Sequence, residues 1–324
     1  MPVAAALLSL DDVLAARETI GGRLHRTPTF TSASLSRLTG ARVQLKAELF
    51  QRTGSFKPRG VLTKLASLTP EEKARGVIGI SAGNHAQALA YAAGLEGVDA
   101  LVVMWRGASE LKIEATREYG AAVDLEADGP GAAFERLDAL LAETGRTLVH
   151  PFDDPLVMAG QGTVGLEVLE DAPDATLVVV PIGGGGLIAG IATAVKALRP
   201  QARVVGVEPK TSRAMHAALE AGDRVEVTPR SVADGLNAPH AGRNALEIVR
   251  ERVDEVVLVT EEEIEHAFRL LYTRAKLACE PAGAAATAAV VAGKVAHEQG
   301  EAVAVVVSGG NVSTDTASAI LARR

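Results

Sequence analysis

Short runs of valine and isoleucine alternate with alanine-rich helical segments along almost the whole chain. Several runs are apolar at every position, as expected for parallel strands that helices cover on both faces. This alternation predicts an α/β fold with parallel sheets. The expected strands are residues 43–47, 77–80, 100–104, 148–150, 177–181, 204–208, 255–259 and 302–307, and the clearest helices are residues 110–119, 132–143, 261–278 and 284–297.

Length and composition suggest two such α/β units. The chain has 324 residues, 48% of them hydrophobic, which is enough for a sizeable core and for about two domains. A stretch with two prolines, residues 150–155, is typical of a crossing between domains. We therefore expect a small domain over residues 71–150 and a large domain that combines residues 1–70 with residues 151–324. Each should hold a mainly parallel, twisted sheet flanked by helices, with a ligand in the cleft between them.

Charge and cysteine content exclude several kinds of partner. The net charge is -7 and the 33 basic residues are dispersed, which argues against nucleic acid as a main partner. Cys279 is the one cysteine, so no disulfide can form within the chain. The apolar residues 4–8 lack a basic leader, and Ser9 with Asp12 is typical of a helix capping box. Because no apolar run approaches the roughly 20 residues of a membrane span, we expect a soluble cytosolic protein.

Four consecutive glycines, Gly183, Gly184, Gly185 and Gly186, stand between an expected strand and a helical segment that begins at Leu187. Such a loop can curl so that successive backbone N–H groups point inward, and the next helix adds its N-terminal dipole. A tight turn would need only one or two glycines, and the spacing differs from the G-x-G-x-x-G of dinucleotide-binding folds. We therefore favour a site for the phosphate of a monoester over a simple turn.

Lys57 lies between an aromatic residue, Phe56, and a proline, Pro58, in a segment bounded by glycines. A solvated surface lysine needs no such neighbours. A lysine that presents its amine to a bound carbonyl compound has to be partly desolvated, so that it can exist as a neutral amine. The segment therefore predicts a reactive lysine. Lys64, seven residues further on in a helical stretch, is expected to be solvated.

Two further loops place polar side chains directly after expected strands. Ser81 and Asn84 follow residues 77–80, and Ser308 follows residues 302–307. Open α/β sheets bind ligands at the carboxyl ends of their strands, so these side chains are candidate ligand contacts. Each also suits a helix cap or a turn, and the two roles are compatible. We interpret His85, next to Asn84, as a structural residue.

Five motifs occur together in one order along the chain. They are Ser55-Phe56-Lys57-Pro58-Arg59-Gly60, Ser81-Ala82-Gly83-Asn84-His85-Ala86-Gln87, Ala159-Gly160-Gln161-Gly162-Thr163, Gly183-Gly184-Gly185-Gly186-Leu187 and Ser308-Gly309-Gly310-Asn311. On these motifs the chain resembles the threonine dehydratase and serine racemase family of pyridoxal-phosphate enzymes, which have the fold type II, or tryptophan synthase β-like, fold. The resemblance extends from about residue 25 to the end of the chain. It is specific for the family and less specific for the substrate.

The resemblance implies a role for each motif in binding pyridoxal 5′-phosphate between the two domains. Lys57 would hold the cofactor through its aldehyde and act as the base at the substrate Cα. Ser308 would face the pyridine nitrogen, and Asn84 would face the 3-oxygen of the ring. The phosphate would bind to Gly183, Gly184, Gly185, Gly186 and the N–H of Leu187; Phe56, Gly235 and Glu280 would border the ring; and the substrate carboxylate would bind to the loop of Ser81, Ala82, Gly83, Asn84 and His85.

Two positions favour elimination over other reactions of the family. A serine at the pyridine nitrogen, in place of a carboxylate, leaves this nitrogen largely unprotonated, so the ring is a weaker electron sink and transamination is disfavoured. In serine racemases of the family, a serine that acts as acid and base precedes the loop glycine, whereas this chain has Ala82 there. A methyl group carries no proton. The resemblance therefore implies dehydration and deamination of a β-hydroxy amino acid to a 2-oxo acid and ammonia.

A divalent cation is less well supported. Many family members bind one through a glutamate and an aspartate a few residues apart. Glu208 matches the first ligand, but the second position falls on Ala214. A hard cation needs several oxygen ligands, so the loss of a carboxylate weakens such a site and leaves Glu208 as its one candidate ligand. The resemblance also implies a homodimer or a homotetramer.

Several alternatives stay open. The substrate could be threonine, serine, 3-hydroxyaspartate or a bulkier β-hydroxy amino acid, because loops of unknown shape build the pocket for the β-substituent. Within the family, the alternative is a serine racemase with side elimination. Outside it, an α/β protein that binds a phosphorylated metabolite would explain the four glycines but not Lys57 with its neighbours.

Overall fold

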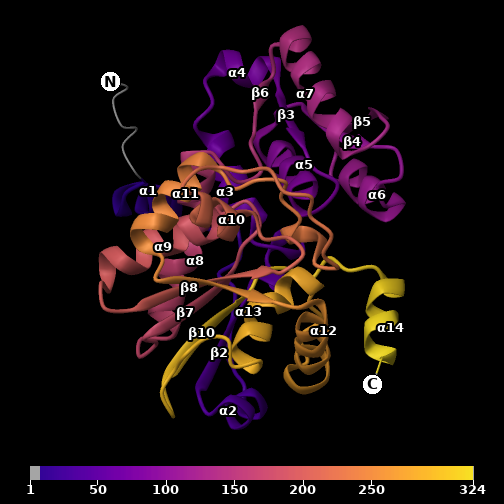
Figure 1. Cartoon of the computed structure of the whole chain (residues 1–324). Helices are drawn as coiled ribbons and strands as arrows, with labels where there is room; N and C mark the ends of the chain where they lie inside the picture. The colour runs from indigo at the N-terminus through magenta and orange to yellow at the C-terminus, as the bar shows by residue number, and fades with distance from the viewer. Residues whose placement is uncertain (1–7, 324) are drawn as a thin grey trace.

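The computed structural model describes residues 8–323, which fold into the alternating strands and helices seen in Figure 1. Most of the apolar run at residues 4–8 lies outside the described residues. The predicted capping box is confirmed, since Ser9 Oγ accepts a hydrogen bond from Asp12 N at the start of α1 (Leu10–Ile20). None of the helices formed by residues 8–323 is long and apolar enough to cross a bilayer.

The elements alternate along the chain as the sequence predicts. The strands are β1 (Thr29–Thr31), β2 (Arg42–Ala47), β3 (Val77–Ile80), β4 (Ala100–Trp105), β5 (Ala122–Ala127), β6 (Thr147–Leu148), β7 (Leu177–Pro181), β8 (Arg203–Pro209), β9 (Glu255–Val259) and β10 (Ala302–Val307). After α1, the helices are α2 (Ala33–Thr39), α3 (Lys57–Ala66), α4 (Pro70–Arg75), α5 (Asn84–Glu96), α6 (Glu110–Glu118), α7 (Pro130–Thr144), α8 (Pro155–Asp171), α9 (Gly186–Leu198), α10 (Ala214–Ala221), α11 (Arg243–Arg252), α12 (Glu261–Leu270), α13 (Pro281–Val291) and α14 (Thr314–Ala322). Short turns connect them at η1 (Glu48–Phe50), η2 (Arg52–Gly54), η3 (Asp234–Leu236) and η4 (Leu271–Ala275).

The strands form two sheets. The larger sheet has six strands in the order β1–β2–β10–β7–β8–β9, and all neighbours are parallel except the edge strand β1, which runs antiparallel to β2. Strands from opposite ends of the chain lie side by side, because β2 pairs with β10 (Figure 1). The smaller sheet has four parallel strands in the order β5–β4–β3–β6. The prediction of an α/β fold with two mainly parallel sheets is confirmed.

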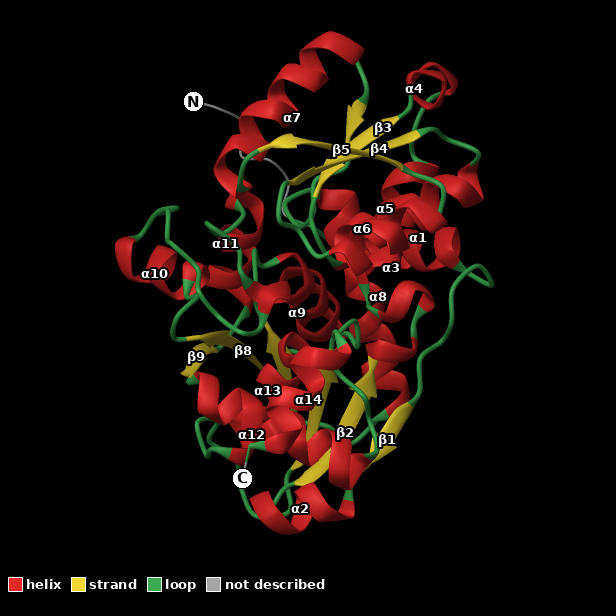
Figure 2. Cartoon of the chain, turned by 90° about the vertical axis from the view of Figure 1, so that its right-hand side faces the viewer, coloured by secondary structure: helices red, strands yellow, loops and turns green. Residues whose placement is uncertain are grey.

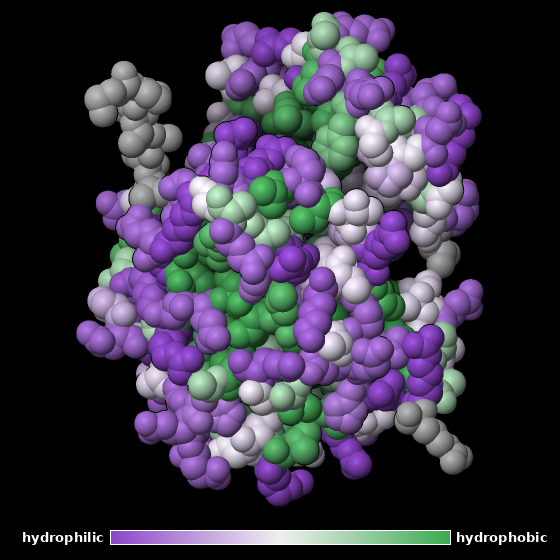
Figure 3. All heavy atoms as spheres, in the orientation of Figure 1, coloured by the Kyte–Doolittle hydropathy of each residue, from purple (hydrophilic) through white to green (hydrophobic). Residues whose placement is uncertain are grey.

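Alternate residues of the central strands pack against helices on opposite faces. In β10, Val303, Val305 and Val307 face a cluster that includes residues of α12 and α13, whereas Ala304 and Val306 face one that includes residues of α8, α9 and α11. The two-residue repeat of a strand causes this division and explains why these strands are apolar at every position. Seen from the side of Figure 1, polar residues cover most of the surface, and hydrophobic residues show mainly in the middle of this face (Figure 3).

Each predicted domain range holds the strands of one sheet. β3 to β6 lie within residues 71–150, and the strands of the larger sheet lie within residues 1–70 and 151–324. Helices α3, α5, α8 and α9 lie between the two sheets (Figure 2). Through Val61, Leu62 and Leu65, α3 shares a hydrophobic cluster with α5 and the smaller sheet. The division into domains stays a prediction, because α3 belongs to one range by sequence and packs against the other.

The edge strands β1 and β5 are not revealed by the sequence pattern, whereas the edge strands β6 and β9 were predicted. β1 has three residues, and β5 carries Asp124 and Glu126 and is only partly buried, so neither forms an apolar run. The strand predicted over residues 148–150 is observed slightly earlier, as β6. β1 and β5 are both edges of their sheets, so solvent contacts the side that a neighbouring strand or helix would otherwise cover. Polar residues are therefore tolerated in these strands, and their sequences are less apolar than those of central strands.

Two helices end earlier than predicted. The helix expected over residues 284–297 ends at Val291, because Gly293 is left-handed with a φ of 66°. The N–H groups of Gly293 and Lys294 bond to carbonyls of the last turn, at Val290 and Ala289, which is a Schellman motif. The helix expected over residues 261–278 likewise ends early, at Leu270, the last residue of α12. The π-helical turn η4 follows it.

Helix α8 crosses its two neighbours at glycines. A Cβ at Gly160 would lie 2.4 Å from Arg59 O and 2.5 Å from Gly60 Cα of α3. On the other side, a Cβ at Gly190 of α9 would lie 2.5 Å from Gly162 N. The backbones thus approach so closely that no side chain fits between them. These glycine contacts set the position of α3 and therefore of its first residue, Lys57.

We predict that Gly160→Ala lowers the free energy of unfolding by about 1–3 kcal/mol, because the added methyl group overlaps backbone atoms of α3 that cannot move aside. Urea denaturation followed by circular dichroism measures the change. Gly131→Ala is the matched control: it is also a helical glycine, but no atom lies within 4 Å of a Cβ built there. Equal stability of the Gly160 variant and the unsubstituted protein would contradict the close crossing.

Candidate active site

Lys57 is the first residue of α3, and backbone pairing places it beside the loop that follows β10. Ser55 forms an isolated β-bridge with Gly309, and Phe56 N donates to Ser308 O over 3.2 Å. Ser308 itself is buried. The lysine motif and the Ser308 motif, from opposite ends of the chain, therefore lie side by side.

The Lys57 amine is partly withdrawn from water. Its side chain is half-buried, and Nζ donates to Pro151 O over 2.7 Å. Nζ also lies 5.2 Å from the centroid of the Phe56 ring. Burial lowers the pKa of Lys57 to about 8, although the charge of Glu280 acts in the opposite direction. A substantial fraction of the amine is therefore neutral in mildly alkaline solution, as a lysine that reacts with a carbonyl group requires.

Asn84, the first residue of α5, belongs to a chain of polar contacts. Its Nδ2 donates to Glu280 Oε1 over 2.7 Å, and its Oδ1 accepts from Asn311 Nδ2 over 2.8 Å. The backbone N of Glu280 donates to Gly309 O over 3.0 Å at the start of α13. The loops around residues 84, 280 and 309 are thus joined in one network.

Glu280 carries little charge in this network. It is buried, and burial raises its pKa to about 8, with a further increase from Asp234. The hydrogen bond from Asn84 and the charges of Lys112 and Lys57 lower the pKa by less. At neutral pH the carboxyl group is therefore largely protonated, which avoids a full buried charge beside Lys57.

The four glycines form the turn between β7 and α9. Gly185 has a φ of 100°, a left-handed conformation that glycine adopts readily. A Cβ at Gly184 would lie 2.3 Å from atoms of the Phe152 ring, so a side chain is excluded there. Gly186 begins α9, and the next residue, Leu187, is buried. The loop therefore presents backbone at the positive end of a helix dipole, which suits an anion.

Gly183 and Gly235 connect the glycine loop to the Asn84 network. A Cβ at Gly183 would lie 3.4 Å from Gly235 O. A Cβ at Gly235 would lie 3.6 Å from Glu280 Oε1 and 3.9 Å from Asn84 Nδ2. The charge of Glu280 also acts on Lys57, so the glycine loop, the Asn84 network and Lys57 lie close together.

The loop between β3 and α5 holds the remaining predicted residues. Ser81 Oγ accepts from Gly83 N over 3.1 Å, and no atom lies within 4 Å of a Cβ built at Gly83. Ala82 packs against the hydrophobic cluster of the smaller sheet. His85 is buried with Nε2 at 2.9 Å from Val149 O, and burial lowers its pKa to about 3. His85 is therefore neutral in a structural position, and the loop has open space beside Gly83.

Both carboxylate oxygens of Glu208, the candidate metal ligand, accept backbone N–H groups. Oε1 accepts from Met215 N and Oε2 from His216 N, each over 2.8 Å, so Glu208 caps α10. Burial raises the pKa of Glu208 to about 8. Within residues 8–323, no three His, Cys, Asp or Glu side chains form a group that could hold a metal ion. The contacts of Glu208 are those of a helix cap.

The prediction of a solvated Lys64 is wrong. Its Nζ pairs with Asp154 Oδ2 over 2.8 Å, and the two side chains are only 19% and 15% exposed. Asp154 also caps α8 by accepting from Leu156 N and Val157 N. Lys64 therefore helps to hold α3 against α8, because its helical face points to a neighbouring helix rather than to solvent. The exposed Lys210 is a better control for Lys57.

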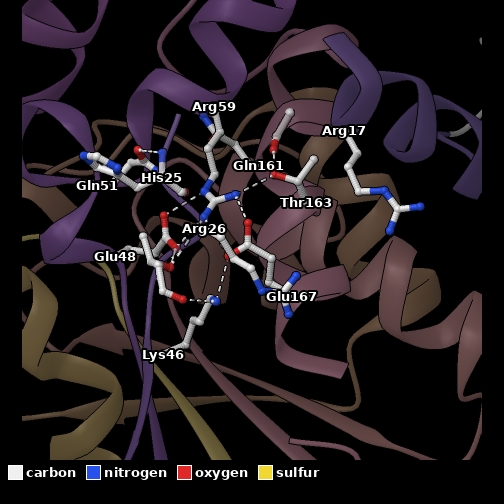
Figure 4. A network of polar contacts seen from close by, with 12 residues as sticks. Arg17, His25, Arg26, Lys46, Glu48, Gln51, Arg59, Gln161, Thr163 and Glu167 are labelled. Carbon is white, nitrogen blue, oxygen red and sulfur yellow. Dashed lines mark hydrogen bonds and ion pairs between the residues drawn. The ribbon is translucent and has the colours of Figure 1, made fainter. Parts of the chain in front are cut away.

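Three groups that hold Lys57, its helix or the Asn84 network were not singled out from the sequence. They are the carbonyl of Pro151, the amide of Asn311 and the guanidinium of Arg59. Arg59 is buried and bonds to the carboxylates of Glu48 and Glu167 (Figure 4). The sequence pointed to Arg59 and Asn311 only because Arg59 belongs to the Lys57 motif and Asn311 to the Ser308 motif. Pro151 lies in the proline-containing stretch that suggested a domain crossing.

The fold and the site together have the groups with which an α/β enzyme could bind an anionic carbonyl compound. A partly desolvated amine, a backbone anion loop at a helix N-terminus and neutral polar side chains are the groups that pyridoxal phosphate needs. The pattern of the family described as pyridoxal-phosphate dependent enzyme matches residues 21–309. The chain belongs to this family, and the resemblance inferred from the five motifs is confirmed.

Known relatives support the same assignment. An L-threonine ammonia-lyase of Thermotoga maritima is 44% identical over 317 residues, which are 97% of this chain and 78% of that protein. The structure of the T.th. threonine deaminase shares 46% identity and a TM-score of 0.88, and the match covers 94% of this chain and 99% of the other. Maize serine racemase shares 35% identity and a TM-score of 0.92 over 96% of both chains. Both branches of the family thus have this fold.

We predict that the Lys57 amine titrates near pH 8 in the protein without cofactor, because burial disfavours its charged form. Only the neutral amine reacts with cyanate, so labelling of Lys57 should rise through this pH. Mass spectrometry of the peptides measures the rate relative to Lys210. In Glu280→Gln the midpoint should move to lower pH, since Glu280 is partly ionised near pH 8 and its charge raises the Lys57 pKa. A midpoint near the 10.5 of an unperturbed lysine would show that the amine is solvated.

Proposed function

We propose that this protein is a pyridoxal-phosphate-dependent ammonia-lyase that converts L-threonine, and L-serine as a second substrate, to a 2-oxo acid and ammonia. The observation that carries the proposal is the Lys57 amine, which is half-buried and has a pKa lowered to about 8. It lies next to the Ser308 loop in a chain 44% and 46% identical to proteins named L-threonine ammonia-lyase and threonine deaminase.

In this proposal the chain holds the cofactor with the residues expected from the sequence. Lys57 would bind the aldehyde, and the N–H groups of residues 183–187 would bind the phosphate. Asn84 would face the 3-oxygen of the ring, and Ser308 would face the pyridine nitrogen. When bound, the cofactor supplies the electron sink that makes the proton on the substrate Cα acidic. Phe56, Gly235 and Glu280 border the ring.

Lys57 Nζ would take the proton from the substrate Cα. Its lowered pKa keeps a supply of neutral amine, which a general base at this position needs. The β-hydroxyl leaves as water after it takes up one proton, equivalent to the proton that Lys57 removes from Cα, and a second water later replaces the amine. The atoms balance, because the water that is lost is taken up again: L-threonine gives 2-oxobutanoate and ammonia, and L-serine gives pyruvate and ammonia.

The substrate carboxylate would bind to the loop of residues 81–85. This loop precedes α5, so its N–H groups lie at the positive end of a helix dipole. The space beside Gly83 is open, which leaves room for a ligand. Because His85 is neutral, it adds no positive charge that would compete with the loop N–H groups for the carboxylate.

Serine racemisation is the second candidate function. It is favoured by the 35% identity to maize serine racemase. Racemisation needs proton carriers on both faces of the substrate Cα, and the loop offers only the methyl group of Ala82 where the racemases have a serine. We therefore propose dehydration as the main reaction, with 3-hydroxyaspartate and bulkier β-hydroxy amino acids as further possible substrates.

A homodimer or homotetramer and a cytosolic location stay predictions from the sequence. For Glu208 we propose the role of a helix cap in place of a divalent-cation ligand, because both of its oxygens accept backbone N–H groups. We predict that the cofactor lies between the small domain, residues 71–150, and the large domain, residues 1–70 plus 151–324. The contacts of α3 with α5 on one side and with α8 on the other support this position.

We predict that the purified protein, supplied with pyridoxal phosphate, forms 2-oxobutanoate from L-threonine and pyruvate from L-serine. A dehydrogenase-coupled assay measures both products. Lys57→Ala should reduce turnover by at least about 10²-fold, the usual cost of losing a general base, whereas Lys210→Ala should leave it unchanged. Binding of the cofactor without 2-oxo acid from any β-hydroxy amino acid would refute the proposed function.

We predict that Ala82→Ser increases the fraction of D-serine formed from L-serine, since the hydroxyl adds a proton carrier at the place where racemases have one. Chiral chromatography, run beside the pyruvate assay, gives the ratio of the two products. Ala82→Gly changes the size of the side chain without adding a hydroxyl, so its D-serine fraction should stay low. Abundant D-serine from the unsubstituted protein would overturn the preference for elimination.

A further inference from the structure

Asn311 makes two hydrogen bonds with a single amide group. Its Nδ2 donates to Thr53 O over 2.7 Å and to Asn84 Oδ1 over 2.8 Å. A backbone carbonyl can only accept, so the Thr53 contact requires that the nitrogen of Asn311, and not its oxygen, points this way. The second hydrogen of the same nitrogen then requires an acceptor, which is the oxygen of Asn84. The orientation of Asn311 therefore determines the orientation of Asn84.

The backbone around Thr53 is shaped for this contact. Thr53 has a φ of 59°, an uncommon left-handed conformation for a β-branched residue. The next residue, Gly54, is also left-handed, and a Cβ there would lie 2.4 Å from Asn311 Oδ1. A side chain at Gly54 would thus collide with the amide of Asn311. In addition, Gly310 N donates to Gly54 O over 2.9 Å, which holds the two loops together.

Glu280 alone would not orient Asn84. Its carboxyl group accepts from Asn84 Nδ2 when it is ionised, but a protonated carboxyl group can also donate to an amide oxygen. Burial favours the protonated form of this group. The contact with Glu280 therefore permits both orientations of the Asn84 amide, whereas the contact with Asn311 permits one.

We propose that Asn311 is a positioning residue that, anchored on the Thr53 carbonyl, turns the NH₂ group of Asn84 toward the cofactor. Asn84 Oδ1 is occupied by Asn311, and one hydrogen of Asn84 Nδ2 goes to Glu280. The second hydrogen of Nδ2 is left to donate to the 3-oxygen of the ring. This inference rests on the proposed function, which supplies the contact between Asn84 and the cofactor. The role of Asn311 requires no direct contact between Asn311 and the ring.

The absorption spectrum of the holoenzyme tests the proposal without reference to turnover. A donor from Asn84 stabilises the ionised 3-oxygen and thus favours the yellow band of the bound cofactor over its ultraviolet band. Asn311→Asp keeps the shape of the side chain but cannot donate, and its carboxylate attracts Asn84 Nδ2 away from the ring. The ratio of the yellow to the ultraviolet band should fall by about tenfold, as for one lost hydrogen bond to a charged group.

A double-mutant cycle shows whether the effect passes through Asn84. Asn84→Ala alone should lower the band ratio, and adding Asn311→Asp to it should change the ratio no further. Asn237→Asp is the matched control, because the Asn237 amide donates to the carbonyl of Ser231, and its band ratio should stay unchanged. If Asn311→Asp fails to fold, Asn311→Ser serves instead, since its one hydroxyl hydrogen cannot serve both Thr53 and Asn84.

Three results would overturn the inference: no change in Asn311→Asp, no change in Asn84→Ala, or an equal further loss when Asn311→Asp is added to Asn84→Ala. Each of these is read from the cofactor spectrum. A failure of the proposed function is distinguishable, because it would appear as an unsubstituted holoenzyme that is yellow but forms no 2-oxo acid. In that case the band ratios would still decide the role of Asn311.

Discussion

The buried guanidinium of Arg59, together with the glycine crossing of α8, fixes the position of Lys57. Arg59 lies two residues after Lys57 on α3 and bonds to Glu48, at the end of β2, and to Glu167, on α8 (Figure 4). Lys46 also pairs with Glu167 over 2.7 Å. Burial lowers the pKa of Arg59, but the two carboxylates outweigh this and raise it above the ordinary value. Because removal of one partner would leave a buried charge unpaired, at a cost of about 3–5 kcal/mol, the helix that carries Lys57 is strongly fixed.

Around this fixed lysine, burial keeps Glu280 and His85 largely uncharged at neutral pH and makes the Lys57 amine easier to deprotonate. Burial moves the pKa of Lys57 down and that of Glu280 up, both to about 8, and it lowers the pKa of His85 to about 3. Low charge in a buried site avoids a desolvation cost before the ligand binds. It also leaves the backbone of the glycine loop as a main source of positive potential for a phosphate. The same burial that stabilises the fold thus prepares the amine for chemistry.

The sequence predicted the parts of the structure that local pattern determines. Buried strands such as β7 and β10 were found with their ends, because each is an unbroken apolar run. The edge strands β1 and β5 were missed, since solvent covers part of each. The motifs identified Lys57, but contacts that depend on the folded arrangement, such as Asn311 with Thr53 or Lys64 with Asp154, leave no trace in composition or spacing. Such contacts join residues that only the sheets bring together.

The central claim is that Lys57 carries pyridoxal phosphate, and borohydride reduction tests it most directly. Reduction fixes the cofactor on the amine that holds it, and mass spectrometry of the digested protein then locates the modified residue. The added mass should lie on the peptide that contains Lys57, with Lys64 and Lys210 unmodified. Cofactor fixed on another lysine, or an active protein with no cofactor on Lys57, would contradict it.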